Sequence, residues 1–288
     1  MREKLIMAVA SGKGGVGKSL LASSLLMLFS KNKKVVAVDA DVDAPNLHLW
    51  LGQGEKWDEV EKVSTNEMPM IDFEKCLGCG QCVEICAFEA LKMKKRKPVL
   101  NRFFCEGCGA CEVICPAKAI KMKKIGNGEI RIKKNVHGFS LVSAQLYPGQ
   151  TGSGRIVDLL KRKAGEFDYD LMIIDSPAGT GCPVIAALGG ANLVILVTEP
   201  TPSGLADLKR VLMVVNHFKI PFRVVINKWD INPSLSRKIK KEFQDQFLGQ
   251  ISYDKKVFQV IANLKTILET NLKAKREIEI IYNKLLKT

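Results

Sequence analysis

The chain has 288 residues, 47% of them hydrophobic, and a formal net charge of +14. This composition supports a sizeable buried core and excludes global disorder, and no apolar stretch is long enough to span a bilayer. The lysines are spread along the chain in short basic runs such as 94–97 and 123–124, so we expect a solvated basic surface and no nucleic-acid partner. A docking surface for acidic redox partners is the alternative explanation.

The first apolar run, over 4–10, predicts a buried strand that leads into a glycine-rich loop. A helix is predicted directly after this loop, over 19–29, and a second buried strand over 34–38. A strand, a glycine loop and a helix in this order are typical of a phosphate-binding site. Because a cleavable signal peptide would remove the loop, we expect a cytoplasmic protein.

The glycine-rich loop has the residues that a nucleotide phosphate needs. Its backbone N–H groups and the start of the helix would converge on the anion. Lys18 would reach the β- and γ-phosphates, and the hydroxyl of Ser19 would bind Mg²⁺. The residues whose backbone would surround the phosphates are Gly14, Gly15, Val16 and Gly17.

The alternation of strands and helices stops between 71 and about 126, where eight of the nine cysteines lie. They form two runs related by an offset of 29 residues, which also relates 92–95 to 121–124. Two copies of one short unit predict a small α+β module, 71–126, inserted into a larger domain made of 1–70 and 127–288. A module of this size has little hydrophobic core, so bound metal should hold it together.

Each run has the C-x2-C-x2-C-x3-C spacing of bacterial two-cluster ferredoxins, in which the fourth cysteine binds the other cluster. This resemblance implies two [4Fe–4S] clusters with crossed ligands. Cluster one would be held by Cys76, Cys79, Cys82 and Cys115, and cluster two by Cys105, Cys108, Cys111 and Cys86. Pro116 follows the second run as in those ferredoxins, but Ala87 follows the first. Zinc is the alternative metal, because paired C-x2-C motifs also bind it.

Strands return over 139–146, 171–174, 193–197 and 222–226, and a helix is predicted over 203–217. Strands that alternate with helices imply an α/β fold, with a mostly parallel sheet covered by helices on both faces. Ligands of such sheets bind beyond the carboxyl ends of the strands, where the motifs described here fall.

The glycine-rich loop also contains a second lysine, Lys13, which ordinary phosphate-binding loops lack. With it, the sequence resembles the deviant Walker A P-loop ATPases of the MinD, ParA and Mrp group, to which the nitrogenase iron protein is related. Further segments resemble that group in the same order: 35–47, 148–154, 170–181 and 226–228. The resemblance covers the chain outside the cysteine module, and MinD-like ATPases with inserted two-cluster ferredoxin modules form a branch of the group.

The resemblance implies roles for individual residues. Asp41 would orient the attacking water, Asp175 would hold Mg²⁺ through water, and Gly179 would sense the γ-phosphate. Asn227 would contact the base of ATP. Lys13 would reach the nucleotide of a second subunit, which implies an ATP-dependent homodimer. With Lys18, this makes Lys13, Asp41 and Asp175 the candidate catalytic residues.

Three features leave alternatives open. The segment 227–230 also fits the Asn-Lys-x-Asp pattern that reads guanine through Asp230, so GTP is an alternative to ATP. Cys182 is interpreted as a small half-buried residue rather than as the ligand of a cluster shared between subunits. The lysine-rich amphipathic stretch 261–286 is expected to close the fold as a packed helix, and membrane binding is not expected.

The leading hypothesis is an ATPase whose nucleotide state is coupled to electron transfer through two clusters toward an unidentified redox partner. One alternative is an iron–sulfur carrier or assembly ATPase like the Mrp group, although the C-terminal Cys-x-x-Cys of that group is missing here. Another is a redox-sensing positioning or regulatory switch, in which the clusters only report redox state.

Overall fold

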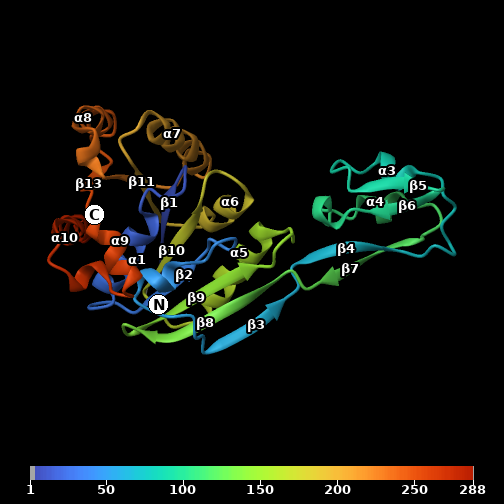
Figure 1. Ribbon diagram of the computed structural model, residues 1–288, viewed down its shortest axis with the longest axis horizontal. Coiled ribbons are helices and arrows are strands. Elements are labelled where there is room, and N and C mark those ends of the chain that lie inside the picture. The colour runs from blue at the N-terminus through green and yellow to red at the C-terminus, as the bar shows by residue number, and fades with distance from the viewer. Residues whose placement is uncertain (1–3, 288) are drawn as a thin grey trace.

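A computed structural model describes residues 4–287 of the chain (Figure 1). Within these residues, nine strands form one sheet, which is parallel from β13 to β9 and antiparallel at β8 and β3. In sheet order the strands are β13 (Phe247–Ile251), β12 (Phe222–Asn227), β11 (Leu193–Thr198), β1 (Leu5–Ser11), β10 (Leu171–Ala178), β2 (Val35–Asp39), β9 (Phe139–Leu146), β8 (Gly128–Val136) and β3 (Glu59–Val63). The predicted mostly parallel sheet is therefore confirmed.

Helices cover both faces of this sheet, as the continuous apolar strands require. Along β10, Leu171 and Ile173 belong to one hydrophobic core, while Met172 and Ile174 belong to the other. The first core packs under α1 (Lys18–Phe29), α2 (Leu47–Trp50) and α10 (Lys273–Leu285). The second packs under α5 (Ser153–Gly165), α6 (Cys182–Leu188), α7 (Pro202–His217) and α8 (Pro233–Glu242).

The amphipathic stretch 261–286 predicted one closing helix, but the C-terminal region is divided into several elements. α9 (Lys256–Ala262) ends early, a 3₁₀ turn (Ile267–Glu269) follows, and only α10 is a long helix. The apolar face of α10 is buried, and Tyr282 packs edge-on against Phe29 of α1 with ring centroids 4.8 Å apart. α10 thus closes the fold as expected, and none of the helices in the described part of the chain is long and apolar enough to cross a membrane.

The cysteine-bearing segment stands away from the large sheet at the end of a two-stranded ribbon (Figure 1). The ribbon pairs β4 (Asn66–Ile71) antiparallel with β7 (Ile120–Ile125), so the predicted boundary at 70/71 falls inside β4. The rest of the module is a hairpin of β5 (Leu91–Lys94) and β6 (Lys97–Leu100), two short helices, α3 (Gln81–Glu84) and α4 (Ala110–Ile114), and a 3₁₀ turn (Arg102–Phe104).

The internal repeat of the sequence is visible in the backbone. Gly80 and Gly109, 29 positions apart, begin α3 and α4 with φ angles of 85° and 79°. Glu89 and Lys118 have the same spacing and both lie in the left-handed region, at 50° and 48°. The two halves therefore fold alike, although their surroundings differ.

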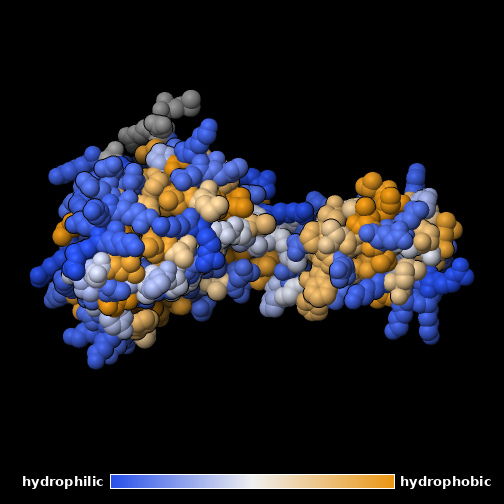
Figure 2. Space-filling model, turned by 90° about the horizontal axis from the view of Figure 1, so that it is seen from above, coloured by the Kyte–Doolittle hydropathy of each residue, from blue (hydrophilic) through white to orange (hydrophobic). Residues whose placement is uncertain are grey.

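The module has a small core and an apolar exterior. Its buried clusters contain few residues, among them Cys82, Cys105 and Cys111. Leu77 and Val113 are 71% and 88% exposed, and Figure 2 shows hydrophobic side chains gathered on this end of the molecule. Such a segment gains little from hydrophobic burial, which leaves stabilisation to whatever the cysteines bind.

Candidate functional site

The glycine-rich loop between β1 and α1 has the shape of an anion-binding loop. Gly15 and Gly17 have φ angles of 75° and 95°, which side-chain-bearing residues rarely adopt. A Cβ at Gly17 would also overlap the side-chain amide of Asn227, which donates to the Val16 carbonyl at 2.8 Å. Lys18 begins α1 and is buried. The loop thus directs backbone N–H groups and the start of a helix toward one space.

Buried carboxylates stand beside this loop, at the carboxyl ends of neighbouring strands. Asp39 and Asp175 are register partners on β2 and β10 and are nearly inaccessible to solvent. Burial raises the pKa of Asp175 to about 6, against the opposing effect of Lys18 and a hydrogen bond with Ser19. One oxygen of Asp175, Oδ1, is buried without a hydrogen-bond partner. An orphaned carboxylate oxygen next to a serine hydroxyl suits a hard cation such as Mg²⁺.

The other acidic residues of this corner have different environments. Asp39 accepts a hydrogen bond from the backbone of Leu47 at 2.9 Å, and burial followed by repulsion from Asp175 raises its pKa. Asp39 therefore orders the loop that follows β2. Asp41 lines the open pocket next to the phosphate loop, and burial raises its pKa too, although the nearby Lys18 opposes this. Asp41, Asp175 and Lys18 thus lie close together at one site.

Lys13 lies on the far side of the loop and is paired within its own chain. Its Nζ is 2.6 Å from Oε1 of Glu199 and 3.4 Å from the Ser203 hydroxyl. Lys228 approaches the other oxygen of Glu199 at 3.1 Å and also donates to the Gly15 carbonyl. Burial raises the pKa of Glu199, but the hydrogen bonds from the two lysines outweigh it and hold the pKa below its usual value. Glu199 was missed by the sequence analysis, although its place directly after β11 is a typical ligand position.

The pocket beside the loop extends toward the C-terminal part of the chain. Its further lining comes from residues that no motif marked: Trp50, Ser252, Tyr253, Asp254, Val257 and Phe258. Asn227 lines this pocket, but Asp230 does not. Instead, Oδ1 of Asp230 accepts a hydrogen bond from the backbone of Tyr253 at 2.8 Å. Asp230 therefore positions the 252–254 loop, which removes the main argument for guanine.

The predicted γ-phosphate sensor, Gly179, has a φ of 94° and donates its N–H to the Ser11 carbonyl at 3.0 Å. α6 begins a few residues later at Cys182, which is exposed, so the expectation of a half-buried side chain is wrong. Cys182 touches Gly154, where an added Cβ would lie 3.3 Å from it. The segments 178–182 and 150–154 are thus in direct contact.

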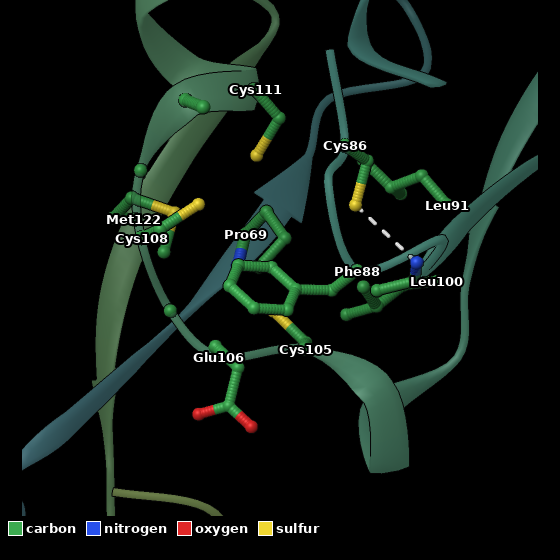
Figure 3. Close-up of a pocket in the computed structure, with 14 residues that line it drawn as sticks. Pro69, Cys86, Phe88, Leu91, Leu100, Cys105, Glu106, Cys108, Cys111 and Met122 are labelled. Atoms are coloured by element: carbon green, nitrogen blue, oxygen red, sulfur yellow. Dashed lines mark hydrogen bonds between the residues drawn. The ribbon is translucent and has the colours of Figure 1, made fainter. Parts of the chain in front are cut away.

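The eight cysteines of the module are sorted into two hollows. Hollow one is lined by Cys76, Cys79, Cys82 and Cys115, and hollow two by Cys86, Cys105, Cys108 and Cys111. The fourth cysteine of each run lies in the hollow of the other run, as the ferredoxin resemblance implied. Figure 3 shows Cys86, Cys108 and Cys111 in hollow two with their sulfur atoms turned toward a common space.

Backbone N–H groups point at matching sulfur atoms in both hollows. The N–H of Ala90 donates to Sγ of Cys86, and the N–H of Ala119 donates to Sγ of Cys115, both at 3.3 Å. Burial raises the pKa of the Cys111 thiol to about 11, with further contributions from Cys105 and Cys108. Within residues 4–287, no three His, Cys, Asp or Glu side chains are placed to hold a single metal ion.

A buried polar junction joins the module to the 148–154 segment. The Thr151 hydroxyl accepts from the Asn66 amide at 2.7 Å and donates to the backbone carbonyl of Cys105 at 2.9 Å. The amide of Asn127 donates to the Thr151 carbonyl at 3.0 Å, and both asparagines are fully buried. Gly107 packs so closely on Asn66 that a Cβ would overlap it. The second cysteine run is therefore attached to the larger domain by contacts that the sequence did not reveal.

Comparison with known proteins identifies related chains over nearly the whole length. Residues 7–267 match the model of the CobQ/CobB/MinD/ParA nucleotide binding domain. The uncharacterized protein MJ0578 of Methanocaldococcus jannaschii is 37% identical over 278 residues, which cover 96% of this chain and 95% of that protein. An iron-sulfur cluster carrier protein of Pyrococcus abyssi is 27% identical over 278 residues, covering 88% of this chain and 75% of that protein.

Solved structures show the same fold. The septum site-determining protein MinD of Pyrococcus horikoshii, complexed with Mg-ADP, superimposes with a TM-score of 0.62 over 98% of this chain and 96% of that chain. The sequence identity of 17% means that this likeness concerns the fold alone.

Proposed function

The chain belongs to the CobQ/CobB/MinD/ParA family of nucleotide-binding domains, and on that premise we propose that it is an ATPase that couples its nucleotide state to electron transfer through two [4Fe–4S] clusters. Membership of this family supports the ATP-binding part of the proposal, namely an ATPase of the MinD/ParA type. The observation that carries the rest of the proposal is the sorting of eight cysteines into two hollows with crossed membership.

At the nucleotide site, the phosphate loop would bind the triphosphate while Lys18 neutralises its β- and γ-oxygens. Mg²⁺, when bound, neutralises the phosphate oxygens further, and Ser19 with the orphaned oxygen of Asp175 would hold it, in part through water. Asp41 lines the same pocket and would orient the attacking water. The apolar residues Val257 and Phe258 suit the flat face of adenine.

Lys13 supports an ATP-dependent homodimer. To reach the nucleotide of a second subunit it must leave Glu199, to which it is bound in the single chain. Lys228 remains available to neutralise Glu199 after that exchange, because it approaches the other carboxylate oxygen. The pair therefore fits a lysine that changes partners when two ATP-bound chains meet.

In the module, the eight cysteines would hold two [4Fe–4S] clusters, which supply one-electron transfer when bound. The chain provides the thiols, three of them buried, which must ionise to bind iron, and the two N–H groups directed at Cys86 and Cys115. Such hydrogen bonds stabilise negative charge on sulfur and raise the reduction potential. The two N–H to sulfur hydrogen bonds have equal lengths, as expected if the two hollows bind the same kind of cluster.

A chain of contacts supports coupling between the two sites. A shift of Gly179 on γ-phosphate binding would displace Cys182 and, through it, Gly154. Thr151 lies three residues before Gly154 on the same segment. Thr151 holds the backbone of Cys105, a proposed ligand of cluster two. Nucleotide binding can therefore change the environment of cluster two more directly than that of cluster one.

The test is a redox titration of the anaerobically purified chain with and without a non-hydrolysable ATP analogue. Coupling free energies are typically about 1–3 kcal/mol, and for one electron about 1.4 kcal/mol corresponds to about 59 mV. We expect a shift of this order in the potential of one cluster. A shift below about 10 mV, with unchanged electron-transfer rates, would show that the sites are independent.

An iron–sulfur carrier is the second candidate, because the relative from Pyrococcus abyssi carries that name. A carrier must release its cluster, whereas here each hollow takes ligands from both halves of the module. Incubation with an apo-ferredoxin separates the two functions. Rapid transfer of iron and sulfide that depends on ATP would favour the carrier over the coupled ATPase.

A further inference from the structure

The two halves of the cysteine module differ in charge at their outer loops. The hairpin of the first half turns through four basic residues, Lys94, Lys95, Arg96 and Lys97, all of them exposed. Within the described part of the chain, none of the four has a carboxylate partner. Lys97 instead lies over the ring of Phe73, 5.1 Å from its centroid. This is a concentrated and uncompensated positive charge.

The backbone of this turn is strained at its two central residues. Lys95 and Arg96 have φ angles of 49° and 61°, so two consecutive side-chain-bearing residues lie in the left-handed region. Two-residue hairpin turns of this geometry usually carry Asn and Gly, and other residues cost on the order of 1 kcal/mol each. Strain of this kind collects at functional positions.

The basic turn lies against the loop that carries the first two cysteines of hollow one. A Cβ at Gly78 would overlap the Arg96 carbonyl, so the two backbones are in contact. Pro98, at the start of the returning strand, lines hollow one together with Cys79, which is exposed. Leu77 projects from the same loop and is 71% exposed. Positive charge and one apolar side chain thus lie where hollow one is nearest to solvent.

The corresponding residues of the second half lie in a strand of the ribbon and not in a hairpin turn. The counterpart of Leu77, 29 positions on, is Glu106, which lines a groove facing the larger domain. The counterparts of Lys94 and Lys95 are Lys123 and Lys124 of β7, and Lys124 stands opposite Glu67 on β4. Only the first half therefore has four consecutive basic residues in a turn beside its hollow.

We propose that this basic turn surface, made of Leu77 and 94–97, is the docking site of an acidic one-electron carrier protein. Charge complementarity selects an acidic partner and accelerates its approach, while Leu77 supplies the apolar contact that protein interfaces need at their centre. Such an apolar residue, on a loop with two cysteines, favours a redox protein over a nucleic acid. The inference rests on the proposed function and names the partner of its first cluster.

The step that follows docking is balanced by one electron. The reduced carrier would lose one electron and be oxidised, and this chain would gain that electron at the cluster that Cys76, Cys79, Cys82 and Cys115 would hold. No bond is made or broken and no proton is required. Cys108 of the second hollow lines a groove together with Thr151 of the larger domain, so the electron would enter at the half of the module that does not line this groove.

The experiment compares two double variants with identical changes in composition and charge. Lys94→Glu/Lys95→Glu alters the basic turn, and Lys123→Glu/Lys124→Glu alters the equivalent positions of the other half. The probe is reduced flavodoxin, an acidic one-electron carrier, with cytochrome c as a basic carrier. Association rates are measured by stopped flow and affinities by calorimetry, at low and high salt, and iron is counted in every preparation.

The proposal expects the first variant to bind flavodoxin at least about tenfold more slowly at low salt, with the difference lost at high salt. The second variant should bind like the unaltered chain, and cytochrome c should not bind the turn. Equal effects of the two variants, or no binding of flavodoxin to the unaltered chain, would overturn the docking site. So would tighter binding of an oligouridylate than of flavodoxin at the turn.

The two proposals fail in different ways. A chain without iron that still binds flavodoxin through the turn would contradict the two-cluster function and leave the docking surface standing. If the chain holds two clusters but its flavodoxin binding is unaffected by Lys94→Glu/Lys95→Glu, only the docking surface is contradicted. Calorimetry supplies the readout in both cases, because binding does not require electron transfer.

Discussion

The two halves of the cysteine module share one sequence pattern and one backbone, but they have different neighbours. The loop of the first half, at Gly78, rests on the basic hairpin turn. The equivalent loop of the second half, at Gly107, rests on Asn66 of the buried junction with the larger domain. A duplicated unit thus obtains two roles through its contacts, one half facing solvent and the other facing the nucleotide-binding domain.

The largest expected effect comes from removing one cysteine in each half. Cys79→Ala and Cys108→Ala should each lower the iron content from about eight to about four atoms per chain, because each hollow loses one of four thiolates. Only Cys108→Ala should also change ATP affinity, because hollow two contacts the junction. Iron and sulfide analysis with calorimetry of nucleotide binding measures both, and Cys182→Ala is the control that should leave iron unchanged.

Stoichiometric zinc in the unaltered chain would refute the two-cluster assignment. An iron loss confined to one of the two variants would show that the hollows are not equivalent.

A matched pair of glycines compares the packing of the two loops. Gly107→Ala places a Cβ against the buried Asn66 side chain and should destabilise the chain by about 3 kcal/mol or more. Gly78→Ala meets the backbone carbonyl of Arg96 in an exposed turn rather than a buried side chain, and should cost less than Gly107→Ala, about 2 kcal/mol. Urea unfolding measures the difference. Gly126→Ala, which has open space around its Cβ, should be nearly neutral, and equal losses for Gly78 and Gly107 would contradict the comparison.

A change of pH should alter the stability of the nucleotide-binding domain through Asp175, with no substitution in the cysteine module. Burial raises the folded-state pKa of Asp175 to about 6, above its unfolded value, so the native chain binds the extra proton. Without Mg²⁺ and nucleotide, stability should therefore fall as pH rises from about 4 to about 6, by on the order of 2–3 kcal/mol, and then level off.

Tryptophan fluorescence follows this transition in the larger domain, because all three tryptophans, Trp50, Trp57 and Trp229, lie outside the cysteine module. Asp175→Asn should flatten the pH dependence, and iron content is checked at each pH. A stability that still falls in the Asp175→Asn variant would assign the effect to another group, with Asp39 the first candidate.

The smallest effect is expected at the junction. Thr151→Val removes the hydroxyl that joins Asn66 to the Cys105 carbonyl and should cost about 1–2 kcal/mol of stability. It should also reduce the shift of cluster potential on ATP binding, with no change in flavodoxin binding at the first half. Thr151→Ser keeps the hydroxyl and should behave like the unaltered chain, whereas loss of the shift in both variants would point to side-chain packing instead.

Much of the nucleotide-binding domain was predictable from local sequence. The apolar runs at 4–10 and 171–174 became β1 and β10, because a strand buried on both faces must be apolar throughout. The phosphate loop was equally clear, since its glycines are required by the local backbone and not by distant contacts. The C-terminal region was less predictable, because the apolar periodicity of 261–286 did not show where the chain leaves the helix between α9 and α10.

The residues that can do chemistry are recognisable from the amino-acid sequence: the phosphate loop with Lys13 and Lys18, and two cysteine runs with a fixed offset. Tertiary structure alone decided what these residues face. Glu199 meets Lys13, and Asn66 meets Thr151, across 186 and 85 positions of the chain, and no local pattern encodes such pairs. The reason is physical, since spacing along a strand or turn fixes local geometry, while a long-range contact depends on how the whole sheet brings distant segments together.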